Sequence, residues 1–321
     1  MKNKRKKNII FCAYIDKFYL IKGIAMCLSL IKNKPDVNLW VLCLDDYTEK
    51  TFKILALKNT TLISLSEFET NELKMIKKYR LPVEYYWTCT PFLPLYIFQK
   101  DKNCTHVAYV DGDIFFYSSL DNLIAELGDA SLYLIPHRFP KDEKDKEKSS
   151  GKFNAAFVIF KRDNIGLACL NNWGKQCLQW CYWFEEKGKM GNQMYLNNWP
   201  KLYNKIIISR NLGIDAAPWN INQYSITKKG VNVFIDGDRL IFYHFHEFKV
   251  LGKDKFSLCS RFIIPRYEYK LSPQVRKYIY DPYVRKIKEA LEKVLQVDQK
   301  FNYFEKRKLI ALPNIKPLLV K

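Results

Sequence analysis

The sequence predicts an α/β protein with a mostly parallel sheet flanked by helices and a helical C-terminal extension. Short apolar runs typical of buried strands alternate with segments of helical apolar spacing, starting at residues 8–14. Hydrophobic residues make up 48% of the 321 residues, so the chain can bury a large core. One run, 106–117, joins an apolar strand to two carboxylates, as expected where a strand's carboxyl end meets a ligand.

In the first half of the chain, strands and helices alternate. The predicted strands are 8–14, 38–44, 61–65 and 107–110. The predicted helices are 20–30, 48–56, 69–80, 91–100 and 120–127. We expect Pro82 to end the third helix, leaving an aromatic segment, 83–90, before the next one.

The second half is less regular. The predicted strands are 131–136, 153–163, 205–209, 231–235 and 240–246, the last two forming a hairpin. The predicted helices are 164–187, a turn at 190–199 ended by Pro200, and 272–296, interrupted by Pro282. The charged stretch 140–152 is expected to be a solvated loop that acts as a lid.

Charge and cysteine content restrict the partners and the compartment. Lys and Arg outnumber Asp and Glu by 53 to 33, which favours an anionic partner: a nucleic acid, an acidic membrane face, an acidic glycan or a nucleotide. An A·T-rich genome explains the lysines equally well. The nine cysteines form no framework, so we expect reduced thiols and a cytoplasmic protein.

Membrane insertion is not expected. The basic N-terminus lacks the pattern of a signal peptide, and no apolar run approaches the roughly 20 residues that span a bilayer. The basic amphipathic pattern of 272–296 leaves two alternatives, packing on its own domain or peripheral docking at the inner, anionic face of a membrane.

Asp111 and Asp113 are the first candidates for a functional site. Two carboxylates after a buried strand are costly to bury unpaired, and a divalent cation would remove that cost. Oxygen ligands suit Mg or Mn. An ordinary acidic turn is the alternative, and the repeat of the motif at 236–238 is best explained as a hairpin turn. His244 and His246 lie on one face of a late predicted strand.

Five segments, in this order, carry a resemblance to a known family: FCAYIDKFYLIKGIAMCLSL, VDGD, FNAAFVIFK, GNQMYLNNWP and YHFHEFK. Together they resemble the GT-A nucleotide-sugar glycosyltransferases of the glycogenin and bacterial lipopolysaccharide galactosyltransferase type. The segments EYYWTCTPFLPLY and APWNINQY also resemble a bacterial branch of nucleotide-diphospho-sugar transferases. The resemblance implies a GT-A-like, Rossmann-type catalytic domain over 1–255, followed by a helical extension over 256–321.

The resemblance also assigns roles to residues. Asp111, Asp113 and His244 would bind Mn or Mg, with His246 as the second choice of histidine. The residues implied in nucleotide binding are Ala13, Tyr14, Asp16, Tyr19, Arg80, Gly112 and Lys249. Those implied in sugar binding are Asn154, Asp215, Trp219 and Asn220. Gln193 would lie near the reactive carbon of the sugar, beside Asn192, which replaces the Asp usual in these enzymes.

These observations predict a metal-dependent glycosyltransferase. It would move a sugar from a nucleotide donor, UDP-linked by preference, to a glycan or lipid-linked acceptor in surface polysaccharide or lipopolysaccharide assembly. Retention of anomeric configuration is favoured. One alternative is an inactive nucleotide-sugar-binding protein, suggested by Asn192. The other is a basic nucleic-acid-binding protein, which is not expected because no zinc module or stacking platform is present.

Overall fold

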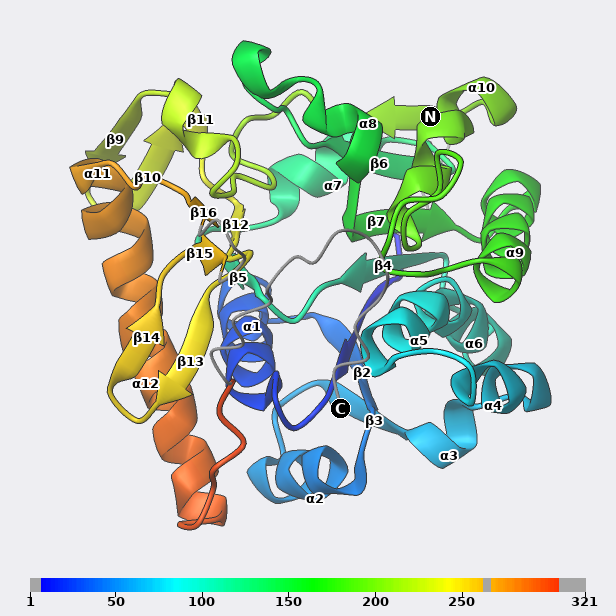
Figure 1. Cartoon of the computed structure of the whole chain (residues 1–321), viewed down its shortest axis with the longest axis horizontal. Helices are drawn as coiled ribbons and strands as arrows, with labels where there is room; N and C mark the ends of the chain where they lie inside the picture. Colours follow the sequence, from blue (N-terminus) through cyan, green and yellow to red (C-terminus); the bar gives the residue numbers. More distant parts are fainter. Residues whose placement is uncertain (1–6, 262–266, 306–321) are drawn as a thin grey trace, which may run out of the picture.

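A seven-stranded sheet runs through the centre of the molecule, between two layers of helices (Figure 1). The computed structural model describes residues 7–261 and 267–305. In spatial order the strands of the sheet are β3 (Thr60–Ser64), β2 (Asn38–Cys43), β1 (Ile9–Ile15), β4 (His106–Val110), β7 (Phe153–Lys161), β6 (Leu132–Pro136) and β8 (Ile206–Ile208).

The sheet is mostly parallel, which confirms the predicted fold class. Strands β3, β2, β1 and β4 run parallel to one another, as do β6 and β8, and only β7 runs antiparallel to its two neighbours. All five residues of β4 are buried, because β1 and β7 flank it and helices cover both faces.

The helices divide into two layers, one on each face of the sheet. The first layer contains α1 (Leu20–Asn33), α2 (Asp46–Leu55), α7 (Asp121–Leu127) and α12 (Asp281–Val297). The second contains α3 (Leu65–Phe68), α4 (Asn71–Lys77), α5 (Pro82–Cys89), α6 (Phe92–Lys100), α9 (Asn164–Gln179) and α10 (Trp199–Leu202).

Alternation along β1 explains why there are two separate cores. Phe11 and Ala13 face the layer of α1, whereas Ile10 and Cys12 face the layer of α5 and α6. All four are fully buried. The sheet therefore carries an unbroken apolar surface on each side, and polar groups are left to the ends of the strands.

A two-stranded ribbon beyond β4 brings a late part of the chain to the end of the sheet. β5 (Ile114–Phe116) pairs antiparallel with β12 (Phe242–His244), with Ile114 opposite His244. The Phe245 amide also donates to the Asp113 carbonyl at 2.9 Å. This pairing fixes His244 beside the loop that follows β4.

The second Asp-Gly-Asp forms a hairpin turn, as expected. Asp236 and Gly237 both have positive φ, 45° and 93°, and join β10 (Asn232–Ile235) to β11 (Asp238–Arg239). β9 (Ile226–Lys229) completes this small sheet. The predicted pairing of strand 240–246 with 231–235 was wrong: β10 pairs with β11, and β12, which lies within 240–246, pairs with β5.

Three predicted boundaries near prolines were wrong. Pro82 starts α5, where the missing N–H has no intrahelical partner to lose, so 83–89 is helical. Pro200 lies in the first turn of α10, directly after a 3₁₀ turn, and Pro282 in the first turn of α12, directly after a π-helical turn.

Two further predictions needed correction. The predicted helix 164–187 ends at Gln179, where Trp180 adopts an extended conformation. The predicted loop 140–152 contains a 3₁₀ turn (Lys141–Glu143) and the short helix α8 (Lys146–Ser150). Another 3₁₀ turn, Gln193–Asn198, precedes α10, and a third spans Ile221–Gln223.

The described part of the C-terminal region packs on the first layer of helices. α11 (Pro273–Val275), a π-helical turn (Arg276–Tyr280) and α12 follow one another, and α12 buries Tyr283, Ile287 and Leu291 in the same core as α1. Two short antiparallel strand pairs precede this region: β13 (Lys249–Gly252) with β14 (Lys255–Ser257), and β15 (Ser260–Arg261) with β16 (Tyr267–Glu268). The division at residue 255 stays a prediction.

Residues 298–305, here called the C-terminal strap, pack against residues near the start of the chain. Tyr303 contacts the rings of Phe18 and Tyr47. Glu305 forms a 3.0 Å ion pair with Lys22, which is only 2% exposed and whose ammonium also lies 3.5 Å from the centre of the Tyr19 ring. The strap therefore braces the β1–α1 loop.

Within the described residues, no helix is both long and apolar enough to cross a membrane.

The buried ion pair at the strap can be tested by removing one charge. Glu305→Gln keeps the shape of the side chain but leaves the Lys22 ammonium buried without its counter-charge. We expect the free energy of unfolding, measured by urea denaturation, to fall by about 3 kcal/mol. The control is Glu289→Gln, which removes an exposed pair with Lys286 and should cost less than about 1 kcal/mol. Equal losses of unfolding free energy in the two variants would show that the Lys22–Glu305 pair is not a buried, stabilising ion pair.

His106 predicts a loss of stability in acid. Burial, with Lys7 and Lys161 nearby, lowers its pKa to about 4, so the folded protein holds this imidazole neutral. The unfolded chain takes up the proton near pH 6.5. The contribution of His106 to the free energy of unfolding is therefore present above pH 6.5. It is lost as the pH falls toward 4, by about 2–3 kcal/mol. In urea denaturation at several pH values, His106→Gln should have a shallower decline than wild type between pH 6.5 and 4.5. Superimposable slopes would exclude the effect.

Candidate active site

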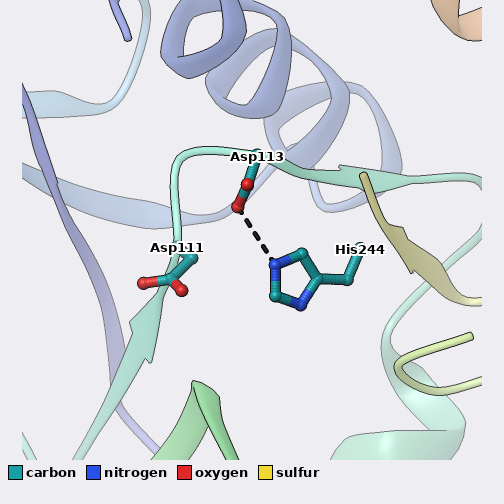
Figure 2. Close-up of side chains that lie close together, drawn as sticks. All are labelled: Asp111, Asp113 and His244. Atoms are coloured by element: carbon teal, nitrogen blue, oxygen red, sulfur yellow. Dashed lines mark ion pairs between the residues drawn. The ribbon is translucent and has the colours of Figure 1, made fainter. Parts of the chain in front are cut away.

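Two carboxylates and one imidazole converge just beyond the end of β4. The ligand atoms of Asp111, Asp113 and His244 all lie within 4.8 Å of one another. Figure 2 shows the two aspartates on the loop between β4 and β5, with the His244 ring reaching them from β12. His244 Nε2 lies 3.3 Å from Asp113 Oδ1.

Local structure explains how the acidic loop is held. The Asp111 amide donates to the Ala156 carbonyl of β7 at 2.8 Å, and the Ile114 amide turns back to the Asp111 carbonyl at 3.2 Å. Gly112 has negative φ, and a Cβ there would meet its nearest neighbour at 3.8 Å. Gly112 thus forms part of the wall of the site. A Cβ would fit there, so the available space does not require a glycine.

The three groups shift one another's pKa values. Burial, and then the charge of Asp113, raises the pKa of Asp111 to about 6. Burial alone would raise the pKa of Asp113, but the neighbouring His244 holds it well below its usual range. Burial alone would lower the pKa of His244, but the carboxylates of Asp113 and Asp215 raise it to about 10. The site therefore attracts positive charge strongly.

A carboxylate behind His244 orients its ring. His244 Nδ1 lies 3.5 Å from Asp215 Oδ1, and Asp215 is 1% exposed. Asn154 Nδ2 donates to the other carboxylate oxygen of Asp215 at 2.9 Å. Asn154 Nδ2 also lies 3.1 Å from His244 Nδ1. If Nδ1 keeps its proton toward Asp215 when His244 loses the other, Nε2 is free to bind a cation beside the aspartates, as in a metal-ligating histidine.

These residues fit a divalent cation of the Mg or Mn type. Two hard carboxylate ligands, one imidazole and a buried supporting carboxylate are present, and remaining coordination positions could be filled by phosphate oxygens. Loss of the His244 proton must accompany metal binding.

The acidic pair and His244 open into one large cavity of about 860 Å³. The predicted site residues that line it are Tyr14, Asp16, Tyr19, Asp111, Gly112, Asp113, Asn154, Asn192, Gln193, Trp219, His244 and His246. The structure thus gathers residues from β1, β4, β7, β12 and the turn before α10 at one end of the sheet (Figure 1).

His246 lines the cavity without joining the acidic group. It is about one-third exposed, and its Nε2 lies 3.8 Å from Glu247 Oε1. Its ring and that of His244 both contact the Trp219 indole edge-on. Of the two histidines on this face, the structure brings His244 to the aspartates.

Five predicted site residues do not line the cavity. Ala13 is buried in the core beside α1, and Asp215 lies behind His244. Lys249 is 3.4 Å from Glu247. Asn220 braces its own loop, donating to the carbonyls of His137 and Asp215. Arg80 is buried and donates to the carbonyls of Cys177 and Leu178 at the end of α9, at 2.6 and 2.8 Å.

Gln193 is held at both ends of its amide, and Asn192 through its amide nitrogen. Gln193 Oε1 accepts from the Ala155 amide at 2.9 Å, and its Nε2 donates to the Ser150 carbonyl at 2.7 Å. Asn192 Nδ2 donates to Thr90 Oγ1 at 2.9 Å. Gln193 thereby ties α8, part of the predicted lid, to the floor formed by β7.

Several residues of the site were not predicted. Among the described residues that line the cavity, Lys146 on α8 is the only lysine or arginine. It forms a 2.7 Å ion pair with Glu143. Lys146 was not predicted because it is one of many charged residues in the stretch 140–152. Tyr109 donates to Asp111 Oδ1 at 2.5 Å. Its place two residues before Asp111, on the same face of the strand, was a signal that could have identified it.

Comparison with known proteins assigns the family. The model of glycosyl transferase family 8 matches residues 8–200, which include the first strand, the acidic pair, Asn154 and Gln193. This chain belongs to glycosyl transferase family 8. It is therefore a glycosyltransferase that takes its sugar from a nucleotide-sugar donor, and the family typically uses a divalent metal.

Two relatives come from Bacillus subtilis (strain 168). The uncharacterized protein YfnD is 28% identical over 287 residues, covering 88% of this chain and 90% of its own. The uncharacterized protein YfnF is 30% identical over 250 residues, covering 75% of this chain and 82% of its own.

Solved structures with similar folds include two glycosyltransferases. A galactosyltransferase, LgtC, in complex with donor and acceptor sugar analogs is 17% identical, with a TM-score of 0.44 over 65% of this chain and 75% of that one. Mouse xyloside xylosyltransferase 1 is 12% identical, with a TM-score of 0.46 over 74% of this chain and 97% of that one.

The contact behind His244 gives a prediction for metal binding. Asp215→Asn removes the charge that orients the ring and keeps one acceptor oxygen. We expect Mn²⁺ affinity, measured by calorimetry on the folded glycosyltransferase, to fall about 10–100-fold. Asp238→Asn, in the remote hairpin, serves as control and should leave the affinity unchanged. Wild-type affinity in the Asp215 variant would show that this carboxylate does not orient a metal ligand.

Proposed function

We propose that this glycosyltransferase binds Mn²⁺ or Mg²⁺ through Asp111, Asp113 and His244 and transfers a sugar from a UDP-linked donor to a glycan or lipid-linked acceptor. One observation carries the proposal: the two carboxylates and the imidazole share a cavity with residues suited to a nucleotide and a sugar. When bound, the metal ion supplies a Lewis acid that offsets the charge growing on the leaving nucleoside diphosphate.

The wall beside β1 would hold the base and ribose. Tyr14, Asp16 and Tyr19 line the cavity there, and Tyr86 from α5 lies next to Tyr14, with ring centres 6.1 Å apart. Asp16 Oδ1 accepts from the amides of Phe18 and Tyr19, so the carboxylate is held in place. Its remaining lone pairs could accept from ribose hydroxyls or a base N–H, and the tyrosine rings offer stacking surfaces.

The opposite side of the cavity would hold the sugar. Asn154, Asn192 and Gln193 present amides, and Trp219 presents an aromatic ring. Acidic residues among the described lining residues are Asp16, Asp111, Asp113 and Glu247. None of these lies on the elements that carry the amides, which supports transfer with retention by front-face displacement rather than through a covalent intermediate on a carboxylate.

The setting is part of the proposal. A net charge of +20 suits an acidic glycan or an anionic membrane face. Lys146, in the cavity wall, adds a cation that could swing from Glu143 to a phosphate or an acceptor acid. We therefore favour surface polysaccharide or lipopolysaccharide assembly at the cytoplasmic face of a membrane, with no role for nucleic acid.

A thermal-shift panel of nucleotides and nucleotide sugars, with and without Mn²⁺, tests the proposal. UDP compounds should raise the melting temperature only when metal is present, because the diphosphate is held through it. Asp113→Asn should abolish the shift and lower transfer or donor hydrolysis by about 100-fold or more. Asp236→Asn, the same substitution in the second Asp-Gly-Asp, should change neither.

Three results would count against the proposal. Stabilisation that persists with a chelator would exclude the metal site. A shift with other nucleotides and not with UDP would exclude the donor class. Binding without any donor turnover would favour a nucleotide-sugar-binding protein over an enzyme.

A further inference from the structure

A buried histidine that was not among the predicted site residues lies in the wall of the cavity. His137 follows the last residue of β6 and is only 4% exposed. Its backbone amide donates to the Lys152 carbonyl at 2.9 Å. Its carbonyl accepts from Trp219 Nε1 at 2.9 Å and from Asn220 Nδ2 at 3.0 Å. Three hydrogen bonds therefore fix the backbone from which this side chain starts.

The imidazole ring of His137 is held as well. The Phe139 ring stacks on it, with ring centres 5.0 Å apart, and the Trp219 ring meets it edge-on at 5.5 Å. Its Nδ1 lies 2.8 Å from the Gly151 carbonyl oxygen. A carbonyl oxygen only accepts, so Nδ1 must carry a proton and donate it.

The other ring nitrogen is open to the cavity. Within the described residues, Nε2 of His137 has no hydrogen-bond partner, and it is not enclosed as Nε2 of His106 is. Burial lowers the pKa of His137 to about 4, although the charge of Asp215 opposes the shift, so the ring is neutral near neutral pH. With its one N–H spent on Gly151, the ring presents a lone pair on Nε2.

The amides on this side of the cavity are already engaged with the protein. The amide nitrogens of Asn154, Asn192 and Gln193 each donate to a protein oxygen, at 2.9, 2.9 and 2.7 Å. The amide oxygens of Gln193 and Asn154 also accept from backbone amides of β7, at 2.9 and 3.0 Å. These side chains shape the pocket but spend much of their hydrogen-bonding capacity inside the protein. Nε2 of His137 has spent none.

We propose that His137 is a specificity-determining residue: its Nε2 accepts a hydrogen bond from a hydroxyl of a sugar bound in this cavity. The class of ligand follows from the acceptor, because a hydroxyl can donate to a lone pair and a carboxylate or ether oxygen cannot. A sugar that lacks this hydroxyl displaces water and leaves the nitrogen unpartnered, which costs affinity. The inference rests on the proposed function, in which this cavity holds the sugar.

The hydroxyl can come from two sources, the donor sugar or the acceptor. The position of the ring favours the donor. The Trp219 ring meets both His137 and His244 edge-on, at 5.5 and 5.2 Å, so the open nitrogen belongs to the part of the cavity next to the proposed metal ligands. A sugar linked to a metal-bound diphosphate would lie there.

The test measures binding by calorimetry on the folded full-length protein, with Mn²⁺ and without acceptor. The probes are UDP, UDP-glucose, UDP-galactose, UDP-N-acetylglucosamine and singly deoxygenated forms of whichever sugar nucleotide binds most tightly. In wild type, removal of one particular hydroxyl should weaken binding by about 10-fold, the effect expected when a buried acceptor loses its donor.

His137→Asn is the decisive variant. The asparagine Nδ2 takes the place of the ring Nδ1 and can still donate to the Gly151 carbonyl, whereas Nε2 is deleted. Affinity for the sugar nucleotide should fall by about 10-fold, affinity for UDP should not change, and the deoxygenated form should bind as well as its parent. His137→Gln, whose amide oxygen reaches the position of Nε2, should recover part of the lost affinity. Weaker binding in the glutamine variant than in the asparagine variant would overturn the assignment to Nε2.

His106→Asn is the matched control. His106 is also buried, has a pKa lowered to about 4 and contacts a protein oxygen through Nδ1, Thr105 Oγ1 at 2.9 Å. It lies at the start of β4 and does not line the cavity. The ratio of sugar-nucleotide affinity to UDP affinity should therefore remain that of wild type. An equal loss in this control would overturn the inference.

The outcomes separate the two sources, and they separate this inference from the proposed function. If His137→Asn keeps sugar-nucleotide affinity but raises the KM for the acceptor about 10-fold, the hydroxyl belongs to the acceptor. If neither quantity changes, the inference is overturned, while the metal site and the donor class stand. If wild type binds neither UDP nor UDP-sugars, the proposed function falls and the inference falls with it.

Discussion

The whole active-site region depends on two carboxylates that are held close together at the end of a buried strand. β4 carries Asp111 and Asp113 out of the core, where each carboxylate would repel the other and lose water. A positively charged group and a hydrogen-bond donor stabilise the two carboxylates. His244 arrives on β12 and Tyr109 reaches back from β4. Without such partners the loop could not keep both groups ionised.

The order of the strands in the sheet brings the side chains of the site together. Because β4 lies between β1 and β7, its end is adjacent to the ends of strands that carry Tyr14 and Asn154. The antiparallel course of β7 places its first residues, rather than its last, at this edge. The β5–β12 ribbon then adds the histidine. The residues proposed to hold the nucleotide, the metal and the sugar thus come from short strand termini of one sheet.

Much of this arrangement was predictable from sequence. The alternation of strands and helices predicted the sheet, and the resemblance of VDGD and YHFHEFK to glycosyltransferase motifs predicted that His244 meets the two aspartates. What could not be predicted depended on partners far away in the chain. Arg80 has the chemistry of a phosphate ligand, yet it caps α9, because carbonyls at 177 and 178 happen to lie there. Tyr109 and Thr90 look like ordinary core residues until Asp111 and Asn192 are seen beside them. Proline rules failed at Pro82 and Pro282, because a break and a first turn look alike in sequence.

The ion pair between Lys22 and Glu305 has a consequence for biosynthesis. Its partners are separated by 283 positions, so α1 leaves the ribosome long before its counter-charge is made. Until residues 303–305 emerge, the ammonium next to Tyr19 lacks the Glu305 carboxylate, and the β1–α1 loop lacks its contact with Tyr303. A contact of such high sequence separation forms late. The nascent polypeptide therefore completes the packing of its β1–α1 loop only after residues up to Glu305 have left the ribosome.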